Sequence, residues 1–340
     1  MVGLSLEHAA AAAARLRRPA IPLLPEIVLA ALGIGAFFAF PNDLAFLARI
    51  LITGLFVLSL SLVLGQAGIP TLGHSASMGT GAYAAGLFAI HLSQDPLLGL
   101  LIGGLAGGAI AAVTGALLLR TAHLTFVMLT IAVAQILYEI ANQAAWLTGG
   151  DNGLSGIGVD PILGVFEFDL YSRTSYLYAL TVLVVSYFVL RTIVDSPFGL
   201  TSRGIHSDPD RMRALGCNTY RHLLIVFTIG GLFAGLSGAL SAQVAQVVGL
   251  ASLSFGTSGD ALVMLIVGGS ARLPGALVGT VVFLIVEHVA ATVNPYHWLF
   301  IIGGLLIVTV LVLPGGLISV VDWVAARMPW SALGRGTRHG

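Results

Sequence analysis

Apolar segments of about 20 residues recur along most of this chain and are separated by short polar runs. A helix rises 1.5 Å per residue, so a segment of about 20 residues crosses the roughly 30 Å hydrocarbon core of a bilayer. We therefore predict an all-α, polytopic helical membrane protein with about ten transmembrane or re-entrant spans. The predicted spans are residues 22–40, 44–65, 73–92, 97–119, 122–147, 175–193, 222–247, 258–270, 274–293 and 297–316.

Two of these spans are irregular. The eighth, at 258–270, is too short to cross a bilayer as one helix, and Asp260 is expected to cap it. The third follows a Gly-Gln-Ala-Gly-Ile-Pro run at 65–70 and is rich in glycine. Non-helical backbone at membrane depth survives only where protein or a water-filled cavity satisfies it, so such breaks often flank a transport route. The alternative is that these glycines serve only close helix packing.

Glycine pairs spaced four residues apart occur in two further spans. Four residues make about one helical turn, so each pair forms a notch on one helix face. Small residues at such notches allow helix backbones to approach closely in membranes. We expect helix–helix contacts at Gly103 with Gly107, Gly104 with Gly108, and Gly231 with Gly235.

A polar island at 191–221 interrupts the apolar pattern and contains the signals of a short helix at 209–215. Ser207 or Asp208 can accept hydrogen bonds from the first N–H groups, and a proline suits the first helical position. Gly216 can close the helix in a left-handed conformation. A capped helix in the largest basic loop of a membrane protein is expected to contact a partner.

The distribution of charge predicts the orientation. The chain is 57% hydrophobic and 9% charged, whereas soluble domains carry roughly 25% charged residues. A cytoplasmic N-terminus places all fifteen basic residues except Arg49 and Arg173 on the cytoplasmic side. The predicted organisation is a cytoplasmic segment at 1–21, a transmembrane domain at 22–316 and a cytoplasmic C-terminal tail at 317–340. Within the transmembrane domain, residues 148–173 form an outer loop and residues 194–221 a cytoplasmic loop.

Few polar side chains lie inside the predicted spans. Gln135, Glu139 and Asn142 recur at helical spacing on one face of the fifth span, and they either line a cavity or form a buried polar seam. Gln66 and His74 lie at the broken entry of the third span and are further candidates for a substrate path. A structural hydrogen bond to freed backbone is the alternative for His74. Glu287 and His288, near the outer end of the ninth span, are expected to be satisfied at the membrane interface.

No catalytic chemistry is visible in the sequence. The chain has no lysine and therefore no phosphate-binding loop of the Gly-x-x-x-x-Gly-Lys type. Its nine histidines are scattered without metal-ligand spacing, and Cys217 is the single cysteine. We expect neither an enzyme nor a bound cofactor or metal, and any active transport would draw energy from a partner or an ion gradient.

Four segments resemble the permease subunits of bacterial ABC importers for branched-chain amino acids, specifically the LivM type. The first two are Gly65-Gln66 through Gly73-His74 to Tyr83, and Thr148-Gly149-Gly150-Asp151-Asn152-Gly153-Leu154-Ser155-Gly156-Ile157. The third is Asp208-Pro209-Asp210-Arg211-Met212-Arg213-Ala214-Leu215-Gly216, continuing to Phe227 and Phe233-Ala234-Gly235-Leu236-Ser237-Gly238-Ala239-Leu240. The fourth is Val267-Gly268-Gly269 through Pro274 to Gly279. The resemblance covers about residues 45–315. The chain departs from the family where Arg211-Met212-Arg213-Ala214 replaces an acidic residue and Ala-Ala, and where Gly269-Ser270-Ala271 replaces Gly-x-Gly.

The resemblance implies a location and partners. The location is the bacterial plasma (inner) membrane, and the partners are two cytoplasmic ABC ATPase subunits, a sister permease and a periplasmic or lipid-anchored substrate-binding protein, with no nucleic acid. The coupling helix that docks on an ATPase would comprise Pro209, Asp210, Arg211, Met212, Arg213, Ala214, Leu215 and Gly216. Met212 and Leu215 would insert, and Arg211 and Arg213 would flank them. The outer loop, with Gly149, Gly150, Asp151 and Gly153, would help to receive the binding protein.

Three other interpretations stay open at this stage. The same importer class can carry urea, amides or another small polar solute. A stand-alone secondary transporter or channel would need an ion-coupling site, for which Glu139 and Glu287 are candidates, but only Arg49 could supply a base near membrane depth. A purely structural membrane protein would not need the broken third and eighth spans.

Overall fold

The computed structural model describes residues 24–121, 123–161, 172–270 and 272–293, and single positions between 300 and 318. The chain divides into two units, Met1–Pro41 and Asn42–Gly340. The first unit contains α2 (Leu24–Ala39), which corresponds to the first predicted span. The predicted segment 1–21 lies outside the described residues, as does the tail from 317 apart from Leu317 and Ile318.

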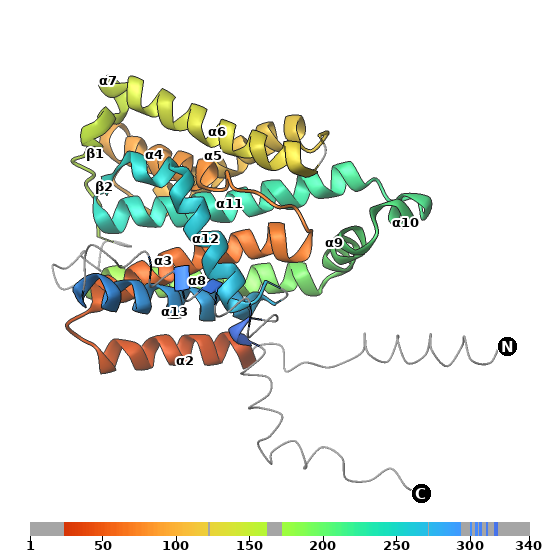
Figure 1. Ribbon diagram of the computed structural model, residues 1–340. Coiled ribbons are helices and arrows are strands. Elements are labelled where there is room, and N and C mark those ends of the chain that lie inside the picture. Colours follow the sequence, from red (N-terminus) through yellow and green to blue (C-terminus); the bar gives the residue numbers. More distant parts are fainter. Residues whose placement is uncertain are drawn as a thin grey trace, which may run out of the picture. The chain divides into compact units, whose positions relative to one another are not determined.

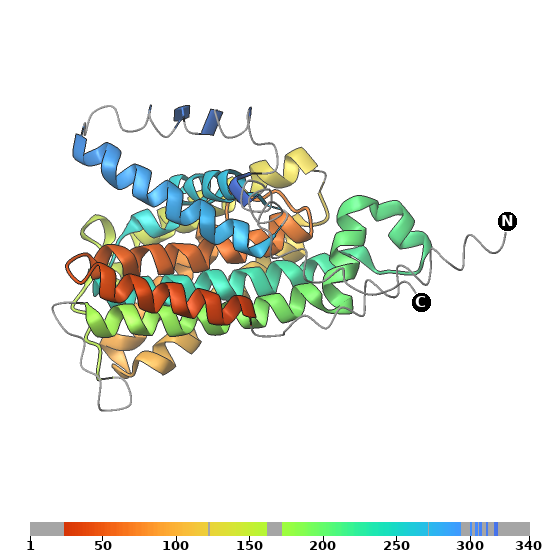
Figure 2. The same ribbon diagram turned by 90° about the horizontal axis from the view of Figure 1, so that it is seen from below.

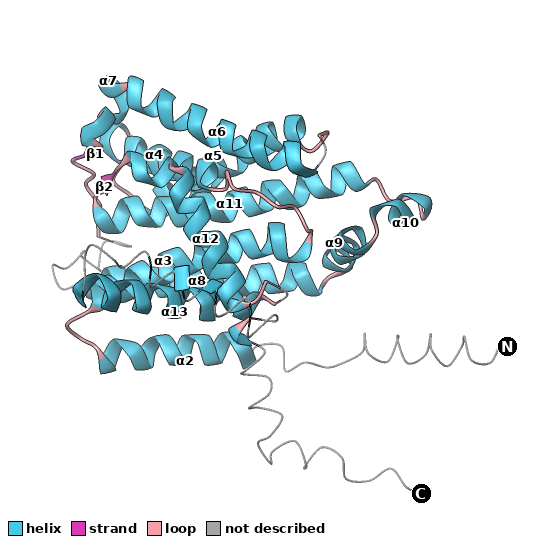
Figure 3. Ribbon diagram, in the orientation of Figure 1, coloured by secondary structure: helices cyan, strands magenta, loops and turns pink. Residues whose placement is uncertain are grey.

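The second unit is built almost entirely of helices (Figures 1 and 3). Its elements are, in order, α3 (Leu44–Leu60), the π-helix η1 (Ser61–Gln66), α4 (Ser75–His91), α5 (Pro96–Leu118), α6 (His123–Gln143), α7 (Ala145–Thr148), η2 (Gly150–Asn152), β1 (Leu154–Ser155), α8 (Arg173–Asp195), α9 (Pro197–Ser207), α10 (Pro209–Ala214), α11 (Thr219–Ala245), β2 (Val247–Val248), η3 (Leu250–Leu253), α12 (Phe255–Gly268) and α13 (Leu273–Val293).

Six helices within the described residues are long and apolar enough to cross a membrane. They are α3 continued by η1, α5, α6, α8, α11 and α13. The helices α2 and α12 are shorter, and α4 has 17 residues. The predicted multi-pass helical membrane protein is therefore confirmed. The count of about ten spans and the side on which the termini lie stay predictions, and the tenth span at 297–316 falls largely outside the described residues.

Polar caps define where several helices begin. The carboxylate of Asp95 accepts from the N–H of Leu97 at 2.9 Å, directly before Pro96 opens α5. Ser254 caps α12 by accepting from the N–H of Thr257 at 3.3 Å. The prediction that Asp260 caps this helix is wrong, because the helix begins at Phe255 and Asp260 lies in its second turn.

Two short strands depart from the all-α prediction. Leu154 pairs with Val248 and Ser155 with Val247, which joins the segment after α6 to the segment after α11. Leu154 and Val248 belong to an apolar cluster that also contains Tyr83 of α4, Ile157 and Leu253. The β1–β2 strand pair therefore closes one end of the bundle, the strand end, opposite the end that carries α9 and α10 (Figures 1 and 2).

Helices α4, α5 and α11 meet backbone to backbone at glycines. A Cβ atom on Gly107 of α5 would lie 2.6 Å from the Gly231 carbonyl oxygen of α11, and one on Gly103 would lie 2.7 Å from the Gly81 carbonyl oxygen of α4. Such distances leave no room for a side chain. The expected helix contact at the pair Gly103 and Gly107 is therefore confirmed.

The other predicted pairs behave in the same way. A Cβ on Gly104 would lie 2.7 Å from the Leu236 side chain, and one on Gly108 would lie 3.3 Å from Leu232. A Cβ on Gly235 of α11 would lie 2.9 Å from the Cα of Gly107. Since lipid offers no hydrophobic force between helices, this close van der Waals contact is what holds α5 to α11.

The helix that starts as α3 widens into a π-helix at Ser61–Gln66 and then stops. Gly68 follows at φ +68°, where a Cβ would run into the His206 ring. Residues 69–74 then lead into α4 without regular structure. Short π-segments occur often at functional sites. The predicted irregular entry to the third span is confirmed.

We expect Gly107→Ala to lower the free energy of unfolding by about 1–3 kcal/mol, because the new methyl group must push two backbones apart. Gly259→Ala is the matched control: a Cβ at Gly259 in α12 meets nothing within 4 Å, so this change should be neutral or stabilising. Thermal unfolding in detergent, followed by circular dichroism, measures both. Equal effects of the two substitutions would contradict the packing role of Gly107.

Candidate functional site

His74 lies at the centre of the bundle, directly before α4. It is 2% exposed, its Nε2 lies 2.8 Å from Ser59 Oγ of α3, and its ring stacks on Phe56 with centroids 5.4 Å apart. Ser59 Oγ also donates to the Phe56 carbonyl at 2.6 Å. A hydroxyl has one proton to donate, so Nε2 of His74 must be the donor in its contact with Ser59. His74 thus joins the start of α4 to the last turn of α3.

The start of α4 is also tied to the short helix α12. The N–H of Ser75 donates to Ser258 Oγ at 2.8 Å, and Ser75 Oγ donates to the Leu253 carbonyl at 3.3 Å. Ser75 and Ser258 are fully buried. The two irregular spans predicted from the sequence therefore meet at the centre of the bundle.

Gln66 ends the π-helix and is 2% exposed. Its Oε1 accepts from the guanidinium of Arg203 in α9 at 3.1 Å. Close by, Gly68 lies against the ring of His206, also in α9. The break between α3 and α4 is therefore in direct contact with the loop that contains the predicted coupling helix.

The polar stripe of α6 lies apart from Gln66 and His74. Gln135 and Glu139 are exposed on the surface of this chain, and Asn142 is half-buried. Glu139 accepts from Gln143 Nε2 at 2.8 Å. Only 22% of the most apolar stretch of α6 is buried, against 72% for the corresponding stretch of α3 with η1. The stripe belongs to the least covered of the six candidate spans.

Two cavities lie at opposite ends of the bundle. The strand-end cavity lies at the end with β1 and β2 and has a volume of about 590 Å³. It is lined by Arg49, Thr53 and Phe56 of α3 and by residues of α4, α11, η3, α12 and α13. The loop-end cavity, of about 1010 Å³, is lined by Leu64 and Gly68 and by residues of α9, α10 and α11, among others. Neither cavity is lined by the α6 stripe.

One continuous segment runs from the first cavity to the second. Phe56 lines the strand-end cavity and Leu64 lines the loop-end cavity, whereas residues 57–63 between them are all buried. Ser59 lies in this closed stretch and bonds His74. Ser59 and His74 therefore lie in the buried stretch between the two cavities.

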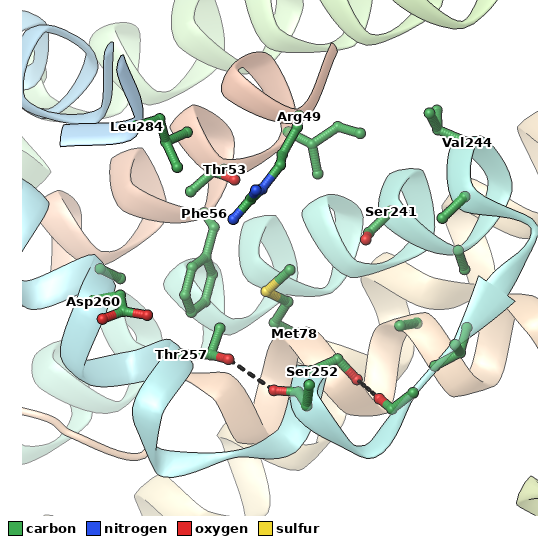
Figure 4. Close-up of a pocket in the computed structure, with 18 of the residues that line it drawn as sticks. Arg49, Thr53, Phe56, Met78, Ser241, Val244, Ser252, Thr257, Asp260 and Leu284 are labelled. Atoms are coloured by element: carbon green, nitrogen blue, oxygen red, sulfur yellow. Dashed lines mark hydrogen bonds between the residues drawn. The ribbon is translucent and has the colours of Figure 1, made fainter. Parts of the chain in front are cut away.

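The strand-end cavity contains three charged side chains, those of Arg49, Asp260 and Glu287, whose grouping was not predicted from the sequence. Figure 4 shows two of them, Arg49 and Asp260. Arg49 of α3 donates to Glu287 of α13 at 3.0 Å. Asp260 of α12 interacts electrostatically with both. The signal in the sequence was an arginine within one apolar segment and carboxylates within two others. His288 packs against Phe46 instead, with ring centroids 4.6 Å apart.

The predicted coupling helix is present as α10. Asp208 Oδ1 accepts from the N–H of Arg211 at 2.9 Å, and Pro209 opens the helix. Gly216 closes it at φ +87°, while the N–H of Cys217 donates to the Met212 carbonyl at 3.1 Å. The capping predictions are therefore confirmed.

The surface of α10 is strongly charged. Arg211 and Arg213 bond the acids three residues before them, Asp208 and Asp210, with Arg213 to Asp210 at 2.8 Å. Leu215 is 75% exposed. Met212 instead turns toward α9, where it packs on Gly204. The insertion of Leu215 and Met212 into an ATPase stays a prediction.

Helix α9, the amphipathic neighbour of α10, was not predicted. It begins at Pro197 after α8 ends at Asp195, and it buries Gly199, Ser202 and Ile205. Ser202 Oγ lies 2.8 Å from Nε2 of His222 in α11. The helix thus links α10 to α11 and, through Arg203, to Gln66.

The predicted outer-loop residues form a compact turn after α6. Gly149, Gly150 and Gly153 all adopt positive φ, at 78°, 57° and 74°, which favours glycine at each position. Asp151 between them is exposed. The loop residues 162–171 lie outside the described part of the chain. Contact of this turn with a binding protein stays a prediction.

Comparison with known proteins supplies the family. Residues 43–310 match the family described as branched-chain amino acid transport system / permease component. The high-affinity branched-chain amino acid transport system permease protein LivM of Escherichia coli (strain K12) is 26% identical over 284 residues, which are 77% of this chain and 67% of that protein. No solved structure matches the chain.

Two further relatives match shorter stretches. The guanosine ABC transporter permease protein NupQ of Bacillus subtilis (strain 168) is 36% identical over 91 residues, which are 26% of this chain and 27% of that protein. LivH of Escherichia coli (strain K12), also a high-affinity branched-chain amino acid permease protein, is 27% identical over 125 residues, or 36% of this chain and 40% of LivH. With the family match spanning most of the bundle, the chain belongs to the permease components of branched-chain amino acid transport systems.

Proposed function

We propose that this chain is a transmembrane permease subunit of an ATP-driven ABC importer in the bacterial plasma (inner) membrane. It forms half of a translocation path for branched-chain amino acids by alternating access. The observation that carries this proposal is the family match over residues 43–310. The arrangement of two cavities separated by the buried stretch 57–63 supports it, since alternating access needs a barrier between two openings.

The end of the bundle with α9 and α10 faces the cytoplasm in this proposal. There α10 docks on one of two ABC ATPase subunits, with exposed Leu215 as its apolar contact and Arg211 and Arg213 beside it. Movement of α10 passes to α9 through Met212 and Gly204, and from α9 to the π-helix through Arg203 and Gln66. ATP hydrolysis in the docked ATPase subunit thereby acts on the barrier segment, residues 57–63.

The exposed face of α6 contacts a sister permease. A carboxylate such as Glu139 and a polar side chain such as Gln135 are costly in contact with lipid tails, on the order of 2.5–3.5 kcal/mol for an acid at mid-helix. A second permease chain would cover this face and leave the stripe of Gln135, Glu139 and Asn142 lining the path between the two subunits. At the strand end of the bundle, exposed Asp151 contributes to the surface that receives a substrate-binding protein.

A second cargo is favoured by one observation. The match to the guanosine permease covers 26% of this chain at 36% identity, higher than the identity to LivM. The match to LivM extends over 77% of the chain, which favours amino acids. Urea, amides and other small polar solutes remain alternatives within the same importer class.

Purification of the tagged chain in mild detergent, with mass spectrometry of its partners, tests the proposal. Two ABC ATPases and a second permease are expected, and the purified assembly in liposomes should import L-leucine only with ATP and the binding protein. A chain that purifies alone and moves solute without ATP would instead establish a secondary transporter or channel.

Gly216→Pro is expected to abolish coupled uptake. Proline cannot adopt φ +87° and removes the N–H that donates to the Arg213 carbonyl at 2.9 Å, so the end of α10 loses its shape. ATP hydrolysis by the assembly should persist while L-leucine import falls by about tenfold or more, a loss of about 1.4 kcal/mol in coupling. The control is Leu215→Met, which keeps an apolar side chain at the proposed contact and should import at the wild-type rate. Normal import by Gly216→Pro would refute the coupling role.

Arg203→Gln should weaken the link between α9 and the π-helix. Loss of the charge-assisted hydrogen bond to Gln66 costs about 1.5–3 kcal/mol, so ATPase binding should be retained while import per ATP decreases severalfold. The single variants Arg203→Gln and Gln66→Leu and their combination form a double-mutant cycle on import rate. Additive effects in this cycle would show that the contact transmits nothing.

Cysteine scanning tests the α6 face in a Cys217→Ser background. Gln135→Cys, Glu139→Cys and Asn142→Cys should react with a water-soluble thiol reagent in the assembled importer, because they would line a water-filled path. Ala134→Cys, at a fully buried position of the same helix, is the unreactive control. Protection of all three positions both with and without ATP would remove them from the path.

A further inference from the structure

The strand-end cavity combines an apolar wall with charged side chains. Phe56, Met78, Met264 and Leu284 give it an aliphatic and aromatic surface, and Arg49, Asp260 and Glu287 are the charged residues of its lining. In Figure 4 the Arg49 side chain extends into the cavity above Phe56, and Asp260 approaches from the α12 side. Its volume of about 590 Å³ falls within the range of small-molecule sites, roughly 300–1,000 Å³.

The charges are not balanced within the cavity. Arg49 is paired with Glu287 at 3.0 Å, which leaves Asp260 as an additional negative charge. No hydrogen bond or ion pair of the described residues engages the Asp260 carboxylate, and Ser254 rather than Asp260 caps α12. Asp260 therefore has no visible part in holding the fold, although an ionised side chain inside a span is costly.

Arg49 also has unused capacity. A guanidinium offers five N–H donors in a planar fork, and Glu287 takes one of them. The remaining donors suit the two oxygens of a second carboxylate. The Arg49 side chain keeps 60% of its surface exposed, so an incoming group can reach it from the cavity.

These features match the chemistry of one solute class. An α-amino acid with an apolar side chain carries an ammonium, a carboxylate and a hydrocarbon group within a few ångströms of one another. Asp260 is complementary to the ammonium, Arg49 to the carboxylate, and the apolar wall to the side chain. A neutral nucleoside or urea would leave both charges without a counterpart.

We propose that Arg49 and Asp260 form a zwitterion-binding site inside the permease, at which the amino acid pauses between the binding protein and the barrier at Ser59 and His74. This inference rests on the proposed function and adds to it the residues that recognise the cargo. Glu287 holds the Arg49 guanidinium in place when the site is empty. The cargo carboxylate then shares the fork with Glu287.

The site lies between elements that meet at the barrier. Arg49 and Phe56 are on α3, Phe56 stacks on His74, and Asp260 lies two residues after Ser258, which bonds the N–H of Ser75. A cargo molecule that bridges Arg49 and Asp260 therefore bridges α3 and α12. Occupancy of the site would be felt directly at the start of α4, below the cavity floor.

The test uses the complete importer in liposomes, with wild-type ATPases, sister permease and binding protein, and radiolabelled L-leucine. Asp260→Asn keeps size and shape and removes the charge. Import per ATP hydrolysed should fall at least about tenfold, because a charge-assisted bond to the ammonium is lost. Asp260→Glu should restore a measurable part of it. ATP hydrolysis stimulated by the binding protein should be kept, which separates this effect from misfolding.

Arg49 is tested together with its partner. Arg49→Gln with Glu287→Gln removes both members of the ion pair, so that Glu287 is not left as a carboxylate without its partner, and import should again fall at least about tenfold. The matched control is Asp43→Asn, an exposed acid beside the start of α3 that does not line the cavity, and it should import at the wild-type rate.

The outcomes separate the two proposals. If the wild-type assembly and the Asp260→Asn assembly import L-leucine equally well, the zwitterion site is overturned and the proposed importer stands. Arg49 and Glu287 would then only tie α3 to α13. A wild-type assembly that imports guanosine or urea but no amino acid overturns the proposed cargo, and the zwitterion site with it.

Discussion

Close backbone contact among α4, α5 and α11 is the constraint on which the rest of the unit depends. In a bilayer the hydrophobic effect does not drive one apolar helix against another, so helices must gain van der Waals contact by approaching closely. Gly81, Gly103, Gly107 and Gly235 allow this approach. The three helices form a rigid core against which α3 and α6 pack.

Around this core the irregular elements are held by hydrogen bonds rather than by shape alone. The backbone of α4 is bonded at its start to Ser258 of α12, and His74 bonds Ser59 of α3. These bonds satisfy polar groups where the chain is not helical, which a membrane interior otherwise penalises. The same places separate the two cavities, so the satisfaction of the backbone and the closure of the barrier are achieved by the same residues.

Much of this architecture could be predicted from periodicity and composition. Helix positions followed from the apolar segments, and the caps at Asp208 and Gly216 followed from local backbone chemistry, because both signals are contained in neighbouring residues. The cap of α12 was missed because Asp260 is as plausible a capping residue as Ser254 until the first helical residue is known. Helix α9 was missed because its sequence, Pro197–Ser207, is too polar for a span and too short for a clear period. The grouping of Arg49, Asp260 and Glu287 could not be predicted, since it brings α3 together with α12 and α13, which lie far from it in the sequence.

The π-helix at Ser61–Gln66 has a geometric consequence for the whole of α3. A π-turn accommodates about one residue more than an α-turn, and one residue corresponds to about 100° of rotation about the helix axis. Gln66 therefore faces a different neighbour from the one it would meet at the end of an unbroken α-helix, and in this chain that neighbour is Arg203. A one-residue deletion within 61–66 would leave α3 nearly as long as before but would turn Gln66 away from α9. The angular register of this short segment, more than its length, is what natural variation must preserve.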